Sequence, residues 1–511
     1  MSPALALAAL LVAAAWYWIR LAGADAPFVY HADEPLIVLR AMRMLALGEL
    51  NPHWFRYPPL PIYFHAAVEL PVRLLTAAPV AGAAELAEHC QGVPPQAFPY
   101  VYAGRLGSVA FALATVVQIV RVMNLLGHRW AGLGAGLLFA ASPLAAQSAT
   151  AVTVDMPMAL LVISAVHFAV RAMQHTDAAD IRRDCTRFTV AAALAACVKY
   201  NAAVLLLLLP VLVAMKGLGA RRILSWTAAH AVLAAAIFLA TTPFAVLDPE
   251  HFWDRTVGMP YNIAHYARGH LGFDQGSALL KSAATIWRDL GPVSLLALCA
   301  VPRLFTRRWR AMVAPICLSV FLLWIPVAVA HVYFPRNVLG FAPMLACLAL
   351  IGATVVGDGL ARGLGRLGAP RGRQDRLLAT ALGVALVVQA ASQVRGVLRT
   401  ATLHDVRTEA YRWIGANLAP GTRVISEWYT PQVHFDPRFA VRCVRYLART
   451  DFDAMRAAFD VALVSSAIKS RFGDPATTTY ARLGPERLVR RWAPDAQHGT
   501  KGADVELYRL D

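Results

Sequence analysis

Long apolar stretches separated by short polar turns dominate the first four-fifths of the chain. A helix needs about 20 apolar residues to cross the hydrocarbon core of a bilayer. The turns and the polarity of the flanking residues predict helical spans over these stretches: 3–19, 102–123, 130–146, 156–170, 188–215, 223–241, 277–301, 311–330, 337–356 and 377–394. The pattern therefore predicts a helical protein that crosses a membrane many times.

The stretch 188–215 has two interpretations, because it is too long for one crossing and carries Lys199-Tyr200-Asn201 near its middle. It is either two short helices that meet at Lys199, or one tilted helix whose lysine extends to the interface. The first interpretation gives about eleven crossings and keeps the basic turns on one side of the membrane. The charge pattern therefore favours a break at Lys199.

Composition supports a membrane protein: 58% of the 511 residues are hydrophobic, 15% are charged, and the mean hydropathy is +0.51. The net charge of +17 does not indicate nucleic-acid binding, because the basic residues gather in turns between apolar spans. By the positive-inside rule these turns and the N-terminus are cytoplasmic, and the C-terminus is outside. The basic turns are residues 121–129, 171–187, 216–222, 303–310 and 362–376.

The seven cysteines are scattered without a CxxC pair, so we expect core residues and neither disulfides nor a metal site. The tail from residue 399 has the composition of a soluble domain, with a helical pattern over 408–418 and strand patterns over 422–426 and 460–465. The predicted organisation is a transmembrane domain over 1–398 and a small outer α/β domain over 399–511.

Two acidic residues, Asp33 and Glu34, follow the first apolar span. Asp33 precedes a helical run that contains Pro35, so it is either an N-cap, a general base that accepts a proton from a hydroxyl, or both. The run places Arg40 and Arg43 on one face, which suits a helix that lies against anionic headgroups.

The turn Arg56-Tyr57-Pro58-Pro59 opens a second amphipathic run over 60–74. The prolines fix a turn and the start of a helix, and so orient this loop. Arg56 and Tyr57 are candidates for contact with a substrate, as residues that bind a phosphate-bearing lipid donor. The sequence thus predicts two interfacial helices in the first outer loop.

Three further charges lie where apolar spans end. Asp155 is either a helix cap before Pro157 or a functional carboxylate, and Lys199 and Arg336 are either snorkelling cations or ligands of a phosphate. Two cations and two acidic loops on one face favour a phosphate-bearing lipid substrate. The histidines show no HExxH spacing, so we predict no cofactor; a divalent metal is possible but not indicated.

In this order and spacing the motifs resemble the GT-C superfamily of integral-membrane glycosyltransferases, in the branch of protein O-mannosyltransferases and aminoarabinose transferases. The chain departs from that pattern at Arg56, where some relatives carry an acid, and at Asn337, where tyrosine is common. The motifs are Asp33-Glu34, Pro58-Pro59-Leu60, Asp155, Lys199-Tyr200-Asn201, Thr242-Pro243-Phe244 with Leu247-Asp248-Pro249, and Arg336-Asn337 with Pro343.

The resemblance implies a glycosyltransferase that uses a polyprenyl-phosphate sugar and inverts the anomeric centre. It implies that Asp33 is the base, with Glu34 in support and Asp155 as a second acidic site, while Lys199 and Arg336 bind the donor phosphate. The expected location is the bacterial inner membrane with a periplasmic active site and C-terminal domain. The acceptor, whether lipid, polysaccharide or protein, stays open. The alternatives are a lipid or sugar flippase and a non-catalytic partner subunit.

Overall fold

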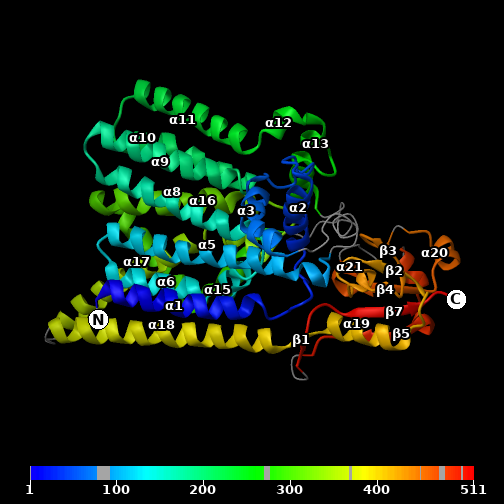
Figure 1. Cartoon of the computed structure of the whole chain (residues 1–511). Helices are drawn as coiled ribbons and strands as arrows, with labels where there is room; N and C mark the ends of the chain where they lie inside the picture. The colour runs from blue at the N-terminus through cyan, green and yellow to red at the C-terminus, as the bar shows by residue number, and fades with distance from the viewer. Residues whose placement is uncertain are drawn as a thin grey trace.

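The helical bundle predicted from the apolar stretches makes up most of the molecule (Figure 1). The structure is a computed structural model that describes residues 2–76, 92–269, 277–366, 371–448, 450–470, 478–495 and 499–511. Among these residues eight helices are long and apolar enough to cross a membrane. The multi-pass architecture is therefore confirmed, and the number of eleven crossings stays a prediction.

The helices of the membrane part follow the predicted ranges to within a few residues at most ends. Their bounds are α1 Pro3–Ala22, α2 Glu34–Leu47, α3 Leu60–Leu75, η1 Pro95–Ala97, α5 Phe98–Leu125, α6 Arg129–Ala141, α7 Pro143–Ala149, α8 Asp155–Gln174, α9 Ala178–Ala196, η2 Tyr200–Leu207, α10 Leu208–Met215, α11 Ala220–Thr241, α12 Phe244–Leu247, α13 Pro249–Trp253, α14 Met259–Arg268, α15 Ala278–Leu290, η3 Gly291–Phe305, α16 Arg307–Ala328, η4 Pro335–Val338, α17 Ala342–Arg366 and α18 Arg371–Thr402.

The stretch 188–215 is broken at Lys199, as the charge pattern indicated. Lys199 is extended, with φ −149° and ψ 118°, between the end of α9 and the start of η2. Helix α9 begins at Ala178, ten residues earlier than predicted, because the Asp177 carboxylate caps it by accepting hydrogen bonds from the backbone N–H groups of residues 179 and 180. The basic connection 171–187 is therefore largely helical.

The predicted span 130–146 is also interrupted, here between α6 and α7. The Ser142 hydroxyl accepts a hydrogen bond from the Ala145 amide, and Pro143 occupies the first turn of α7. This pair of signals ends one helix and begins the next, because a cap and a proline both favour a helix start. The break turns the chain toward the start of α8, where Asp155 lies.

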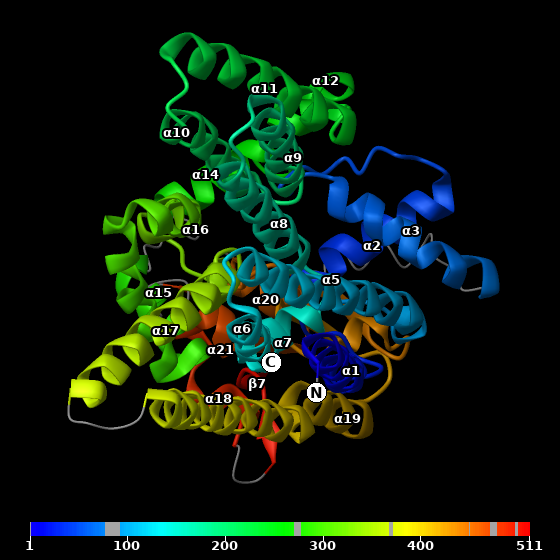
Figure 2. The ribbon, with the colours of Figure 1, turned by 90° about the vertical axis from the view of Figure 1, so that its left-hand side faces the viewer.

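Close helix contacts in the bundle depend on small residues. Gly352 of α17 lies against η3, where an added Cβ would overlap the Leu296 carbonyl oxygen. Such contacts let two backbones approach closely in a membrane protein. Helices α11 and α18 lie at the periphery of the bundle (Figure 2) and bury little of their surface, as expected for helices that face lipid.

The two ends of the bundle differ. The N-terminus, the connection α10–α11, the end of α17 and the start of α18 lie at one end, whereas α2, α3, α12, α13 and the C-terminal domain lie at the other (Figure 1). Part of the basic turn 362–376, residues 367–370, lies outside the described residues. The described basic turns and the acidic loops thus stand at opposite ends, as the topology prediction requires.

The C-terminal part forms a small α/β unit beside α2 and α3. Its elements are β1 His404–Asp405, α19 Val406–Asn417, β2 Arg423–Glu427, η5 Val433–Phe435, β3 Ala440–Val444, α20 Phe452–Ala458, β4 Val461–Ser465, α21 Ser466–Lys469, α22 Thr479–Arg482, η7 Pro485–Arg487, β5 Leu488–Trp492, β6 Thr500–Lys501 and β7 Val505–Arg509. The sheet order is β3-β2-β4-β7-β5, and β2 pairs in parallel with both β3 and β4. The predicted helix and both predicted strands are present; the domain boundary at residue 398 stays a prediction, since α18 runs to Thr402.

One expectation about the cysteines is wrong. Cys443, in β3, is disulfide-bonded, whereas the scattered spacing predicted no disulfide. Cysteines distant in sequence pair whenever the fold brings them together, so spacing along the chain cannot exclude it. Disulfides persist in oxidising compartments, which bears on the side of the membrane that this domain faces.

Candidate active site

Four charged side chains predicted as site residues form one chain of ion pairs. Asp33 Oδ2 lies 3.0 Å from an Arg336 guanidinium nitrogen, and Arg336 Nε lies 3.5 Å from Asp155 Oδ2. Lys199 Nζ donates a hydrogen bond to Asp155 Oδ1 at 2.7 Å. Segments far apart in sequence thus bring alternating negative and positive charges to one place.

Neither aspartate caps its helix, so the structure contradicts the interpretation of Asp33 and Asp155 as helix caps. Asp33 precedes α2 in a helical conformation (φ −92°, ψ −19°), and its carboxylate makes no cap hydrogen bond. Asp155 is the first residue of α8, after Val154, which also provides no side-chain cap. Both carboxylates are buried and turn to Arg336 instead.

The two cations are positioned by irregular backbone at helix ends. Lys199 lies in the break between α9 and η2, and Arg336 lies in η4 with its guanidinium 4.4 Å from the Phe334 ring. Lys199 also donates a hydrogen bond of 3.0 Å to Asn337 Oδ1. Asn337, where the resembled family commonly has tyrosine, therefore holds the Lys199 side chain in place here.

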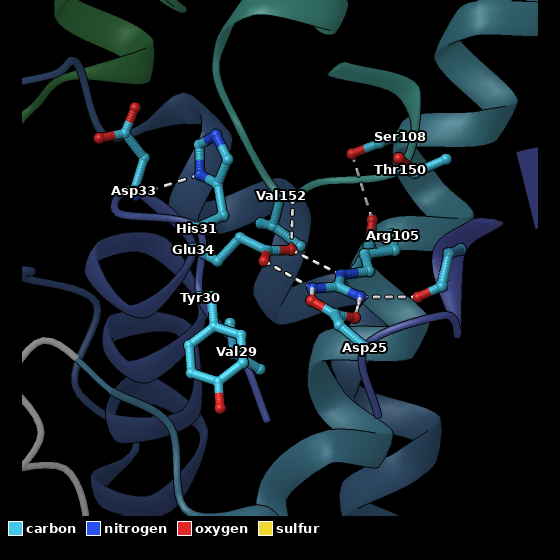
Figure 3. A network of polar contacts seen from close by, with 12 residues as sticks. Asp25, Val29, Tyr30, His31, Asp33, Glu34, Arg105, Ser108, Thr150 and Val152 are labelled. Carbon is cyan, nitrogen blue, oxygen red and sulfur yellow. Dashed lines mark hydrogen bonds and ion pairs between the residues drawn. The ribbon is translucent and has the colours of Figure 1, made fainter. Parts of the chain in front are cut away.

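Glu34 is part of a different network (Figure 3). Its two carboxylate oxygens each accept a hydrogen bond of 2.7 Å from Arg105 of α5, and one accepts 2.9 Å from the Val152 amide. Arg105 also binds Asp25 and the Ala22 carbonyl. Glu34 points away from Asp33, so the structure does not bring it into the charge chain.

The network of Glu34 and Arg105 joins the start of α2 to α5 and so fixes the conformation of the first outer loop. Burial opposes the charge on Glu34, but Arg105 outweighs that cost and lowers the pKa of the carboxyl. Sequence analysis missed Arg105, although an arginine inside an apolar span is itself a signal, because such a charge needs a buried partner. The buried partner of Arg105 is Glu34, the residue next to Asp33.

Two cavities meet at the charge chain. The first, of about 310 Å³, is lined by Asp33, Arg56, Arg336 and by aromatic and basic residues of α14 and the C-terminal domain. The second, of about 340 Å³, is lined by Lys199 and Asn337 together with apolar residues of α14 and α16. Both cavities share three lining residues, Tyr57, Asn262 and Tyr266.

The electrostatics at the junction of the two cavities keep Arg336 and Tyr57 in definite protonation states. Burial lowers the pKa of Arg336, but Asp33, Tyr57 and Asp155 raise it further than burial lowers it, so the guanidinium stays charged. Burial, reinforced by Asp33, raises the pKa of Tyr57 well above its ordinary value. Tyr57 is therefore a neutral hydroxyl, able to donate a hydrogen bond.

The remaining predicted residues divide between the cavity and the core. Arg56 and Tyr57 line the first cavity, and their contact with a substrate stays a prediction. Arg40 does not face headgroups: it is buried, with its guanidinium 4.3 Å from the Trp54 ring and a hydrogen bond to the Leu36 carbonyl. The amphipathic pattern could not reveal that a later aromatic residue would cover this arginine.

One cluster among the described residues has atoms close enough to hold a metal ion: His53, Asp248 and His251. Asp248 accepts hydrogen bonds from Asn51, at 2.6 Å, and from His251 Nδ1, at 2.8 Å. The cluster ties the loop after α2 to the start of α13, and these hydrogen bonds account for its arrangement without an ion. It lies outside both cavities, since none of its residues lines them.

Comparisons with known proteins agree with this architecture. The model of the dolichyl-phosphate-mannose-protein mannosyltransferase family matches residues 101–246. ArnT from Cupriavidus metallidurans, in a structure bound to undecaprenyl phosphate, superposes with a TM-score of 0.58 at 17% identity, over 98% of this chain and 97% of that one. Its apo structure gives a TM-score of 0.56 at 16% identity, over 99% and 98%.

The chain has a GT-C fold.

The apo oligosaccharyltransferase of Archaeoglobus fulgidus shares this fold, with a TM-score of 0.50 at 12% identity over 90% of this chain and 69% of that one. No curated protein matches the sequence. The predicted resemblance is confirmed at the level of the fold, and the family match over residues 101–246 supports the predicted class, a membrane glycosyltransferase.

Proposed function

We propose that this GT-C protein transfers a sugar from a polyprenyl-phosphate donor to an acceptor hydroxyl, with inversion. The observation that carries the proposal is the charge chain at the junction of two cavities: Asp33 and Arg336 line the first cavity, Lys199 lines the second, and ion pairs through Asp155 join them. The ArnT structure of the same fold is bound to undecaprenyl phosphate, and we assign a polyprenyl phosphate of this kind to the present chain.

The donor fits the second cavity. Ile263, Pro326 and Val327 give that cavity an apolar side suited to a prenyl chain, and Lys199 stands at its polar end. Lys199 and Arg336 would bind the phosphate, since cations beside a developing negative charge stabilise it. Both cations are held by Asp155, which keeps two positive charges close together before the donor arrives.

The reaction is a single displacement at the anomeric carbon. The acceptor hydroxyl oxygen in the first cavity forms a bond to that carbon, the bond to the phosphate oxygen breaks, and its electron pair stays on the leaving phosphate. The hydroxyl proton passes to the Asp33 carboxylate. The leaving phosphate needs no proton because Arg336 and Lys199 stabilise its charge, and Tyr57, between the cavities, can orient either substrate through its hydroxyl.

In this proposal Glu34 does not contact a substrate but positions Asp33. Its buried bonds to Arg105 fix the start of α2, and so the position of Asp33. The role assigned to Glu34 by the resemblance, support of the base, is then exercised through the backbone. Arg56 contributes on the acceptor side, where it lines the first cavity.

We further propose that the active site faces the periplasm of a bacterial inner membrane. The basic turns at the opposite end of the bundle are expected to stay in the cytoplasm. The disulfide at Cys443 favours an oxidising compartment for the C-terminal domain. Both arguments give a cytoplasmic N-terminus and a periplasmic C-terminal domain, and we propose a membrane domain over 1–398 and a periplasmic domain over 399–511.

The test is transfer of radiolabelled sugar from a polyprenyl-phosphate donor by the purified full chain. Asp33→Asn should abolish product formation while the protein inserts and melts as the wild type does. Glu250→Gln removes an exposed acid of α13, at the same end of the molecule, and serves as the matched control. Full activity of Asp33→Asn would overturn the assignment of the base.

The same assay decides against the rival function. A flippase would move the labelled lipid across the bilayer of a proteoliposome and form no glycosidic bond. The charge chain lies at helix ends beside the outer loops, whereas transporters keep such charges near the membrane midplane. We therefore expect a glycosidic product.

A further inference from the structure

The first cavity contains a second cationic centre that the charge chain does not use. Arg56 and Arg445 both line it, and both contact Tyr261: the Arg56 guanidinium lies 4.0 Å from the ring centre, and Arg445 donates a hydrogen bond of 2.6 Å to the hydroxyl. Arg56 comes from the loop before α3, Arg445 from the C-terminal domain. Two guanidinium groups are thus gathered around one tyrosine.

Neither arginine forms an ion pair with a carboxylate among the described parts of the chain. Arg56 Nε instead donates to the Thr256 carbonyl at 2.6 Å. Asp254 attracts the charge of Arg56 at longer range, but its carboxylate is occupied by hydrogen bonds from the backbone amides of Thr256 and Val257. Burial, and after it the nearby Arg445, lowers the pKa of Arg56. Two cations brought together without a paired acid form a site that an anion would stabilise.

The fold of the C-terminal domain places its contribution at the edge where ligands bind in parallel sheets. Trp428 directly follows β2, and Arg445 directly follows β3. These strands are parallel, with Glu427 opposite Val444, so the two residues emerge side by side at the carboxyl ends of the strands. The Arg445 guanidinium lies 4.9 Å from the Trp428 ring centre.

The next residue, Tyr429, has a positive φ of 67° and also lines the cavity. A left-handed conformation is unfavourable for a bulky residue and is retained where the surrounding structure requires it. The turn after β2 therefore presents two aromatic rings to the cavity. Flat aromatic faces beside cations are suited to a sugar ring that carries a negative group.

We infer that Arg56 and Arg445 bind an anionic group of the acceptor, and that the acceptor is an anionic saccharide whose ring rests on Trp428 and Tyr429. The inference rests on the proposed function and specifies its acceptor. The anion is a phosphate or a carboxylate, held away from the hydroxyl that reacts at Asp33. The C-terminal domain is then part of the acceptor site.

The first experiment measures binding without catalysis. Glucose 6-phosphate, glucuronate and glucose are titrated into the purified full chain by calorimetry. At least one of the two anionic sugars should bind about tenfold or more tightly than glucose, since a charge-assisted hydrogen bond distinguishes them. The two anionic arms tell phosphate from carboxylate. Equal binding of all three sugars would overturn the inference.

The second experiment locates the site. Arg445→Gln and Arg56→Gln should each reduce the preference for the anionic sugar about tenfold, and Arg445→Lys should retain part of it. Arg442→Gln removes the same charge from an exposed position of β3 and should leave the preference unchanged. An anion preference that survives Arg445→Gln with unchanged affinity would contradict the assignment.

The two proposals fail in different ways. If Asp33→Asn stays fully active, the catalytic assignment is wrong, although anionic sugars can still bind at Arg56 and Arg445. If anionic sugars show no preference while transfer continues, the catalytic assignment stands and the acceptor is not an anionic saccharide. Melting temperatures of all variants identify a substitution that merely unfolds the protein.

Discussion

Removing Arg105 should destabilise the protein strongly, and the structure indicates by how much. The side chain is 3% exposed and holds three acceptors: Glu34, which is fully buried, Asp25 and the Ala22 carbonyl. Arg105→Met would leave Glu34 with only the Val152 amide as a partner. Breaking a buried ion pair by removing one partner costs about 3–5 kcal/mol.

A second estimate comes from protonation. Without Arg105, the buried Glu34 carboxyl can avoid its unpaired charge by taking up a proton. With an ordinary pKa of 4.5, that costs about 3.4 kcal/mol at pH 7, because each pH unit is worth about 1.4 kcal/mol. The two estimates agree, so we expect a loss of about 3–4 kcal/mol in the free energy of unfolding.

The pH dependence has a definite sign. In the wild type the pKa of Glu34 is lowered, so its stabilising effect is present above 4.5 and is lost only as the pH falls through the lowered folded-state value. In Arg105→Met the free-energy cost of protonating the Glu34 carboxyl decreases as the pH falls. The difference between variant and wild type should therefore shrink by about 2 kcal/mol from pH 7 to 5.5.

Reversible denaturation in mixed micelles, followed by tryptophan fluorescence, measures both quantities. Arg121→Met removes an exposed arginine from the other end of α5 and is the matched control. The double variant Glu34→Gln with Arg105→Met should recover part of the loss, because no buried carboxylate is then left next to the deleted guanidinium. A loss below about 1 kcal/mol at pH 7, or one that does not shrink on acidification, would refute the reasoning.

Three further predictions follow from the same kind of argument. Burial raises the pKa of Glu427 from 4.5 to about 7, so its carboxyl should reduce the folding stability by up to about 3 kcal/mol as the pH rises from 4.5 to 7; Glu427→Gln should flatten the melting temperature over this range, and the exposed Glu409→Gln should not. Gly352→Ala should lose about 3 kcal/mol or more or prevent folding, whereas Gly357→Ala on the same helix, where a Cβ meets nothing, should be tolerated in the same denaturation assay. Lys199→Met should lower kcat for transfer about 10²–10³-fold, and a change within twofold would contradict its role at the phosphate.

Much of the architecture is determined by local sequence. Apolar length specified the spans, and prolines and caps specified where most of them start and stop, so the predicted ranges agree with the helices of the bundle. The charge distribution indicated the break at Lys199, because only a break keeps the basic turns on one side. Asp33, Asp155, Lys199 and Arg336 could be selected from sequence, since a charge at the end of an apolar span needs a partner or a function.

The partners of those charges were decided only by the tertiary structure. Asp33 and Glu34 are neighbours in sequence, yet one carboxylate binds Arg336 and the other binds Arg105, because α2 begins between two different helices. Pairings over such separations depend on how the helices pack, which no local pattern records. The same holds for Arg445, which reaches the cavity because two parallel strands end beside it. The sequence determined which charged residues lie at the ends of the membrane spans, and helix packing decided which of them form ion pairs.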